Sequence, residues 1–200
     1  MRICLATKLE IYRGSEAIVV LAIVRGGVLA VLEVAKHLGA PLDVILIRRL
    51  LLPRGPGEPT CAVNVAGTLV LDEELLACSA AANSALDSFI ADALDDLARC
   101  EKLCRNERPA IDLAGKTVLL VDNGIRTGAT MRAAICALHT RGPARIVAAT
   151  PVAATESRAE IEAVADDLVC LAWPQPFGHV GLWYSNFTVP GVDQIRQLLE

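Results

Sequence analysis

The feature that most constrains the fold is a repeated order of buried strand, glycine turn and helix. Ala17–Val24 is a continuous apolar run rich in β-branched residues, which is typical of a strand buried on both faces. The turn Arg25-Gly26-Gly27 follows, and apolar residues then recur at helical spacing across 28–38. Leu42–Ile47 is a second apolar strand. This is a βαβ unit, so its two strands are predicted to be parallel, with a right-handed crossover.

The second half of the chain returns to the same order. Thr117–Val121 reads as a buried strand, Asp122–Gly128 as a turn, and residues 131–138 as one face of a helix. The predicted fold class is therefore α/β: an open parallel sheet with helices on both faces, which binds ligands at the carboxyl ends of its strands. The other predicted elements are strands at 146–150 and 168–171, and helices at 79–104, 156–165 (capped by Thr155) and 194–199.

The middle of the chain departs from this order. Residues 53–59 are so rich in Pro and Gly that they predict an exposed, mobile loop without regular structure. Residues 61–65 and 68–71 predict a hairpin. The whole chain, 1–200, is interpreted as one domain in which 53–75 form a mobile loop and hairpin and 173–200 form a C-terminal segment.

Composition excludes several classes of protein. The formal net charge is −4 and the basic residues are scattered, so a nucleic-acid partner is not expected. Arg25 and Glu33 interrupt the apolar runs, which are too short for a membrane-spanning helix, and no secretory signal layout is present. The seven cysteines show no disulfide rhythm, which indicates reduced thiols and a cytoplasmic protein. Cys100 and Cys104, four residues apart, are interpreted as small buried apolar residues and not as metal ligands.

The segment from Val118 to Thr130 is the most informative part of the sequence. An apolar strand delivers Asp122, and a loop with two glycines and two threonines then leads into a helix. Glycines let main-chain N–H groups approach an anion, and a helix N-terminus adds unpaired donors and a favourable dipole. The hydroxyls of Thr127 and Thr130 add hydrogen bonds to a phosphate, and Asp122 can accept hydrogen bonds from a sugar. The competing interpretation is a polar turn with no ligand.

Other residues leave two interpretations open. Trp183 and Tyr184 suit either stacking on a planar base or packing of the C-terminal segment. Asp95 and Asp96, in the middle of the long predicted helix, are interpreted as part of a solvated face.

The segment Val118–Thr130 resembles the signature with which type I phosphoribosyltransferases bind phosphoribosyl diphosphate (PRPP): an apolar strand, two acids and a Thr-Gly-x-Thr loop. The resemblance extends over nearly the whole chain. Residues 151–153 and 177–187 are similar to an uncharacterised, predicted-phosphoribosyltransferase subgroup. The fold that this resemblance implies is a five-stranded parallel core with a small hood.

The resemblance also implies a reaction. A nitrogen acceptor, nucleobase-like but unidentified, would displace diphosphate from C1 of PRPP, with Mg²⁺ bound through PRPP and not directly by protein ligands. Such proteins often form homodimers. The residue roles carried over are Asp122, Asn123, Arg48 and Arg49 in catalysis; Gly124, Ile125, Arg126, Thr127, Gly128, Ala129 and Thr130 on the 5-phosphate; Arg25, Gly26 and Gly27 on the diphosphate; and Trp183 and Tyr184 at an acceptor site.

One departure from the family pattern concerns charge. Asn123 stands where the pattern has a second acid, so one negative charge is missing beside the sugar. This leaves three hypotheses: a phosphoribosyltransferase whose activity is impaired to some degree, a non-catalytic protein that binds PRPP or a nucleotide, and a sugar-phosphate hydrolase or isomerase on a flavodoxin-like sheet.

Overall fold

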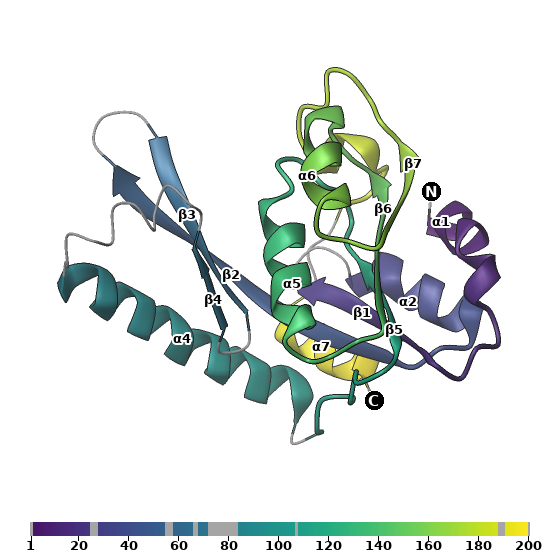
Figure 1. The fold of residues 1–200 in the computed structure, drawn as a ribbon, viewed down its shortest axis with the longest axis horizontal. Coiled ribbons are helices and arrows are strands. Elements are labelled where there is room, and N and C mark those ends of the chain that lie inside the picture. The colour runs from purple at the N-terminus through teal and green to yellow at the C-terminus, as the bar shows by residue number, and fades with distance from the viewer. Residues whose placement is uncertain are drawn as a thin grey trace.

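The structure, a computed structural model, describes residues 2–24, 28–54, 58–65, 68–71, 84–106, 108–187 and 191–199. In this part of the chain one sheet has the strand order β4-β3-β2-β1-β5-β6-β7 (Figure 1). The five strands from β2 to β7 in that order are parallel, and β3 and β4 join them antiparallel. The strands are β1 (Ile18–Val24), β2 (Leu42–Arg54), β3 (Glu58–Val65), β4 (Thr68–Leu71), β5 (Thr117–Val121), β6 (Arg145–Val152) and β7 (Asp167–Ala172).

Helices cover both faces of the sheet, as predicted. Alternate residues of β1 point to opposite sides, so that Val20 and Ala22 enter one core and Val19 and Leu21 enter the other. Helices α1, α2, α4 and α7 pack on the first face, and α5 and α6 on the second. The helices are α1 (Arg2–Lys8), η1 (Glu10–Tyr12), α2 (Val28–Leu38), α4 (Ser84–Arg105), α5 (Ala129–His139), η2 (Thr155–Ser157), α6 (Arg158–Glu162), η3 (Val180–Trp183) and α7 (Val192–Leu199).

The Pro-rich middle is more regular than the sequence predicts. Strand β2 continues to Arg54 and β3 begins at Glu58, with Pro53 opposite Pro59 in the ladder. The prediction of irregular structure is therefore wrong for 53–54 and 58–59. Paired prolines are tolerated where neither nitrogen has to donate to the ladder. The predicted hairpin is confirmed by the antiparallel pairing of β3 with β4. Residues 55–57 and 66–67 lie outside the described part.

The helix predicted at 156–165 is shorter than expected. The turn η2 comes first, and α6 then covers only Arg158–Glu162. Ser157 occupies the N-cap position of α6, and its hydroxyl donates to the Ala154 carbonyl oxygen at 2.8 Å and not to a helix N–H group. Thr155 is therefore not the cap, because the chain needs one 3₁₀ turn before it can enter the helix.

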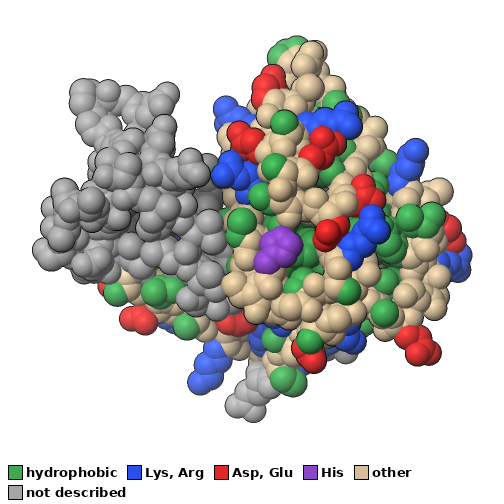
Figure 2. Space-filling view, viewed as in Figure 1, with side chains coloured by type: hydrophobic (Ala, Val, Ile, Leu, Met, Phe, Trp, Pro, Cys, Tyr) green, Lys and Arg blue, Asp and Glu red, His purple; other side chains and the backbone are tan. Residues whose placement is uncertain are grey.

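The surface mixes both signs of charge. Figure 2 shows Lys, Arg, Asp and Glu side chains interspersed over the described part of the visible face, and the whole sequence carries a formal net charge of −4. Among the helices of the described residues, none is both long and apolar enough to cross a bilayer.

A buried ion pair fixes α4 to the sheet. Asp43, at the start of β2, is 0% exposed and accepts a hydrogen bond from Arg105 Nη1 at 2.6 Å. The same carboxylate accepts the backbone N–H groups of Val44 and Ile111, and Arg105 Nη2 also donates to the Val44 carbonyl oxygen. Each charge therefore has several partners, which offsets the cost of burying it. This pair holds the C-terminal end of α4 against β2.

We predict that Arg105→Leu lowers the free energy of unfolding by about 3–5 kcal/mol, because it leaves the Asp43 carboxylate buried without its cation. The measurement is urea unfolding at neutral pH. The control is Arg99→Leu, which removes the exposed ion pair of Arg99 with Asp96 and should cost at most about 1 kcal/mol. Equal losses in the two variants would contradict the anchoring role of Arg105.

Candidate active site

Three neighbouring strands bring the candidate residues to one edge of the sheet. Val24, the last residue of β1, pairs with Leu46 of β2, and Ala22 pairs with Val121, the last residue of β5. Because the strands are parallel, the segments that follow β1 and β5 leave the sheet on the same side. Asp122 therefore emerges beside the end of β1, as the order of strands predicts.

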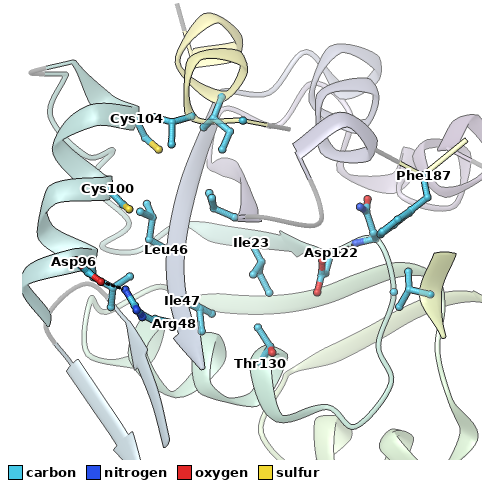
Figure 3. A pocket seen from close by; sticks show the side chains of 18 residues that line it. Ile23, Leu46, Ile47, Arg48, Asp96, Cys100, Cys104, Asp122, Thr130 and Phe187 are labelled. Atoms are coloured by element: carbon cyan, nitrogen blue, oxygen red, sulfur yellow. Dashed lines mark hydrogen bonds and ion pairs between the residues drawn. The ribbon is translucent and has the colours of Figure 1, made fainter. Parts of the chain in front are cut away.

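A cavity of about 730 Å³ lies at this edge (Figure 3). Its walls come from the end of β1, the middle of β2, the loop after β5, one face of α4, and the C-terminal segment. The lining residues are Ile23, Val24, Leu46, Ile47, Arg48, Asp96, Leu97, Cys100, Cys104, Asp122, Asn123, Gly124, Thr130, Val180, Phe187, Gly191, Val192 and Ile195.

The first half of the loop after β5 is pinned to the sheet. The Ile125 N–H donates to the Val152 carbonyl oxygen at 3.0 Å, and the Ala154 N–H donates to the Ile125 carbonyl oxygen at 2.8 Å. The Ile125 side chain is buried. Ile125 thus extends the ladder beyond β6 and has no N–H group to offer an anion, although the sequence groups it with the phosphate-binding residues.

The second half of the loop has free donors. Within the described residues, the backbone N–H groups of 126–131 donate to no protein acceptor. Helix α5 begins at Ala129, and its N-cap residue Gly128 has a φ of +77°, a left-handed conformation that favours glycine. No side chain among the residues that the structure describes caps this helix. A row of unpaired N–H groups at a helix N-terminus is a ready site for an anion.

Gly124 has a packing role that the sequence does not reveal. A methyl group added there would lie 2.7 Å from Val180 Cγ1, which is closer than real contacts allow. The glycine therefore lets the C-terminal segment lie directly on the loop. Tyr184 strengthens this contact, because its hydroxyl donates to the Asn123 carbonyl oxygen at 2.5 Å. The segment around η3 thus covers the beginning of the loop.

Asp122 supplies a carboxyl group to the cavity. The Asn123 N–H donates to Asp122 Oδ1 at 2.7 Å, and Figure 3 shows the Asp122 carboxyl and the Thr130 hydroxyl directed into the same space. Desolvation raises the pKa of Asp122 to about 7, and the hydrogen bond from Asn123 only partly opposes this rise. The carboxyl is therefore poised to hold or release a proton near neutral pH.

An ion pair stands at the side of the cavity. Arg48 of β2 donates to Asp96 of α4, and Arg99 donates to the same carboxylate at 2.8 Å. Asp95 is exposed, as predicted. Asp96 is partly exposed, and it also lines the cavity, because β2 runs past α4 and brings Arg48 to it. Arg49 also belongs to β2, but its side chain lies outside the described part, as do Arg25, Gly26 and Gly27.

The structure leaves several predicted residues away from the cavity. The side chains of Arg126 and Thr127 are exposed and are not among its lining residues. Trp183 and Tyr184 also lie off the cavity wall: the indole Nε1 donates to the Phe177 carbonyl oxygen at 2.9 Å, and the Tyr184 hydroxyl contacts the loop. The aromatic side chain that does line the cavity is Phe187, which sequence reasoning did not single out.

Comparisons with known proteins identify a family. Residues 5–184 match the family described as "Phosphoribosyl transferase domain". Two curated Mycobacterium tuberculosis proteins, from strains CDC 1551 and H37Rv, are 36% identical to the chain over 185 residues, and both are named "Putative phosphoribosyl transferase". The match covers 92% of this chain and 42% of each relative, so the chain spans less than half the length of these curated relatives.

Solved structures extend the comparison. The crystal structure of TT1426 from Thermus thermophilus is similar with a TM-score of 0.83 and 36% identity, over 99% of this chain and 93% of that one. A hypothetical protein from Neisseria gonorrhoeae with bound ppGpp shares the fold with a TM-score of 0.51 and 16% identity, over 99% of this chain and 88% of that one.

We predict that the free energy of unfolding decreases as pH rises from about 4 to about 7. The reason is that the folded chain holds the Asp122 proton up to a pKa of about 7, whereas an ordinary Asp loses it near 3.8. The expected decrease in the free energy of unfolding is on the order of 2 kcal/mol, because solvent at the open side of the cavity screens part of the cost of burying the ionised Asp122 carboxylate. Urea unfolding of Asp122→Asn across this pH range should show a smaller decrease. An identical slope in the variant would refute this assignment.

Proposed function

Because this chain belongs to the phosphoribosyl transferase family, we propose that it transfers the 5-phosphoribosyl group of PRPP to a nitrogen acceptor, with release of diphosphate. The observation that carries the proposal is the row of N–H groups at 126–131, which donate to no acceptor in the described part of the chain, beside a cavity that holds the Asp122 carboxyl. A phosphate and a sugar need these two kinds of group side by side.

In this proposal each part of the site binds one part of PRPP. The N–H groups at 126–131 and the Thr130 hydroxyl donate to the 5-phosphate oxygens. The Asp122 carboxylate accepts a hydrogen bond from a ribose hydroxyl. Arg48 can turn from Asp96 toward the leaving diphosphate, whose other contacts are proposed for Arg25–Gly27.

Mg²⁺ carried on PRPP supplies positive charge beside the leaving group. The Asp122 carboxyl suits a cationic neighbour, because such a charge favours its ionised form and lowers the pKa from its value of about 7. A magnesium ion close to Asp122 would therefore favour its carboxylate form. This charge lies where positive charge develops on the sugar as the bond to diphosphate breaks.

The alternative is a protein that binds PRPP or a nucleotide without turnover. Asn123 supports it, since the side chain is 7% exposed and supplies no charge where the family pattern has an acid. The similar fold of the Neisseria protein with bound ppGpp supports it as well, because ppGpp is also a phosphorylated ribose compound. Turnover is what separates the two functions.

We predict that the chain binds PRPP in the presence of Mg²⁺ and that Thr130→Val weakens this binding by about fivefold to tenfold. Valine keeps the shape of threonine but removes the hydroxyl donor to the phosphate. The measurement is isothermal titration calorimetry. Thr155→Val, an exposed position outside the cavity, is the matched control and should bind PRPP like the original chain. No binding of PRPP by the original chain would sink the proposal.

We predict that Asn123→Asp increases the rate of diphosphate release, by tenfold or more if about 1.4 kcal/mol of charge stabilisation is restored. The measurement is diphosphate release from PRPP and Mg²⁺ across a panel of nitrogen bases. Because the new carboxylate is buried beside Asp122, urea unfolding of the same variant must show that it still folds. A folded variant with an unchanged rate would count against the charge argument. Binding of PRPP with no release in either form would favour the non-catalytic alternative.

A further inference from the structure

The cavity has two chemically different ends. Asp122 and Thr130 form a polar end, next to the loop whose N–H groups at 126–131 donate to no acceptor among the described residues. On the other side of the cavity, Cys100 and Cys104 of α4 stand opposite Leu46 of β2 (Figure 3). The proposed function uses the polar end and leaves the opposite end without a ligand.

The described side chains of that second end are apolar. Leu97, Cys100 and Cys104 come from one face of α4, and Val192 and Ile195 come from α7. Leu46, Leu97, Cys104 and Ile195 belong to the same buried core cluster and are at most 7% exposed. Burial also raises the pKa of the Cys104 thiol. We call this region the apolar end.

The backbone at the apolar end offers little hydrogen bonding. Leu46 pairs with Val24 in the β1–β2 ladder. Leu97 and Cys100 lie inside the 22-residue helix α4, whose interior N–H and carbonyl groups bond one another, whereas Cys104 lies in its last turn. The thiols are weak donors and weak acceptors. Among the described residues that line the cavity, the charged side chains on this side are Arg48 and Asp96, which pair with each other.

A purine with a polar edge suits these walls poorly. Its ring nitrogens and exocyclic groups need donors and acceptors, and each one left unpaired inside a protein would weaken binding by roughly tenfold. An apolar ring gains affinity from the same walls, because its burial removes hydrocarbon from water. The acceptor nitrogen itself must stay near the polar end, where the sugar would lie.

We propose that the acceptor is an apolar nitrogen heterocycle, an inference that rests on the proposed function. One ring nitrogen reaches the sugar, and the hydrocarbon part of the ring fills the apolar end between α4, β2 and α7. The transfer would join that nitrogen to C1 of the ribose as the bond from C1 to diphosphate breaks. The proton of the ring N–H group would leave to solvent or to the Asp122 carboxylate.

Benzimidazole and purine provide a matched pair of probes. Both are planar bicycles of nearly the same size with an imidazole N–H, but benzimidazole has a benzo ring where purine has a ring with two nitrogens. Cys100 reports occupancy, because its thiol is partly exposed and lines the cavity. Cys136 is an internal control, since its thiol is exposed and is not among the lining residues.

The experiment measures alkylation of both thiols by N-ethylmaleimide, followed by peptide mass spectrometry, with PRPP and Mg²⁺ present. Benzimidazole is expected to slow the labelling of Cys100 at a concentration at least about tenfold below that needed for purine. Labelling of Cys136 should not change with either probe. Diphosphate release is measured in parallel and should be faster with benzimidazole than with purine or hypoxanthine.

A pair of variants tests the location of the probe. Cys100→Ser places a hydroxyl in the apolar end and should weaken benzimidazole binding several-fold by calorimetry, whereas Cys136→Ser makes the same change on α5 and should not. Urea unfolding checks that both variants fold.

Two outcomes overturn the inference. In the first, purine protects Cys100 from labelling at a concentration equal to or lower than that needed for benzimidazole. In the second, purines cause diphosphate release, whereas benzimidazole neither protects Cys100 nor causes release. Both leave the proposed function standing. Protection by benzimidazole without any PRPP binding in calorimetry would instead support the apolar ligand site and refute the transfer reaction.

Discussion

The placement of β5 between β1 and β6 is the constraint on which the rest of the structure depends. Val118, Leu119, Leu120 and Val121 have no exposed surface, so both faces of this strand are covered and its register is fixed on both sides. A one-residue shift would exchange its two buried faces and misplace every side chain. This fixed register determines where Asp122 leaves the sheet. The polar chemistry of the cavity is thus a consequence of apolar packing.

The two halves of the loop after β5 have different roles: the first half is held by the sheet, and the second half offers donors to a ligand. Its first part extends the ladder through Ile125 and lies under Val180, so it cannot move freely. Its second part leaves N–H groups unpaired at the start of α5. Donors held in place before a ligand arrives need little reorganisation when charge develops, which is what a site for phosphate or for a charged transition state requires. One short segment therefore contains both a part that is held in place and N–H groups that can bind a ligand.

Helix α4 supplies part of the apolar wall of the cavity. The buried Asp43–Arg105 pair fixes one end of the helix to β2, and the Arg48–Asp96 pair joins the two elements again beside the cavity. Between these pairs, α4 presents Leu97, Cys100 and Cys104 to the interior. The ion pairs thus define the position of an apolar wall, although neither contributes to its hydrophobic surface. A ligand that spans the cavity meets charge and donors at one end and hydrocarbon at the other.

The sequence by itself determined the α/β class, the parallel core and the loop at Asp122–Thr130, because these depend on local patterns: buried β-branched runs, helical spacing, and glycines at turns. It also identified the hairpin, but it did not reveal that Pro53 and Pro59 lie within paired strands. The packing role of Gly124 depends on Val180, which is more than fifty residues away, and only the tertiary structure could show it.

The apolar end of the cavity also became apparent only in the tertiary structure. Cys100 and Cys104 looked like ordinary small core residues, and Trp183 and Tyr184 were compatible with stacking as well as with packing, which the sequence favoured. Only the tertiary structure decided that α4 and α7 enclose one end of the cavity and that Tyr184 bonds to the loop. The physical reason is that strand and turn signals arise from neighbours along the chain. The walls of this cavity, in contrast, are made by side chains that folding brings together from separate elements.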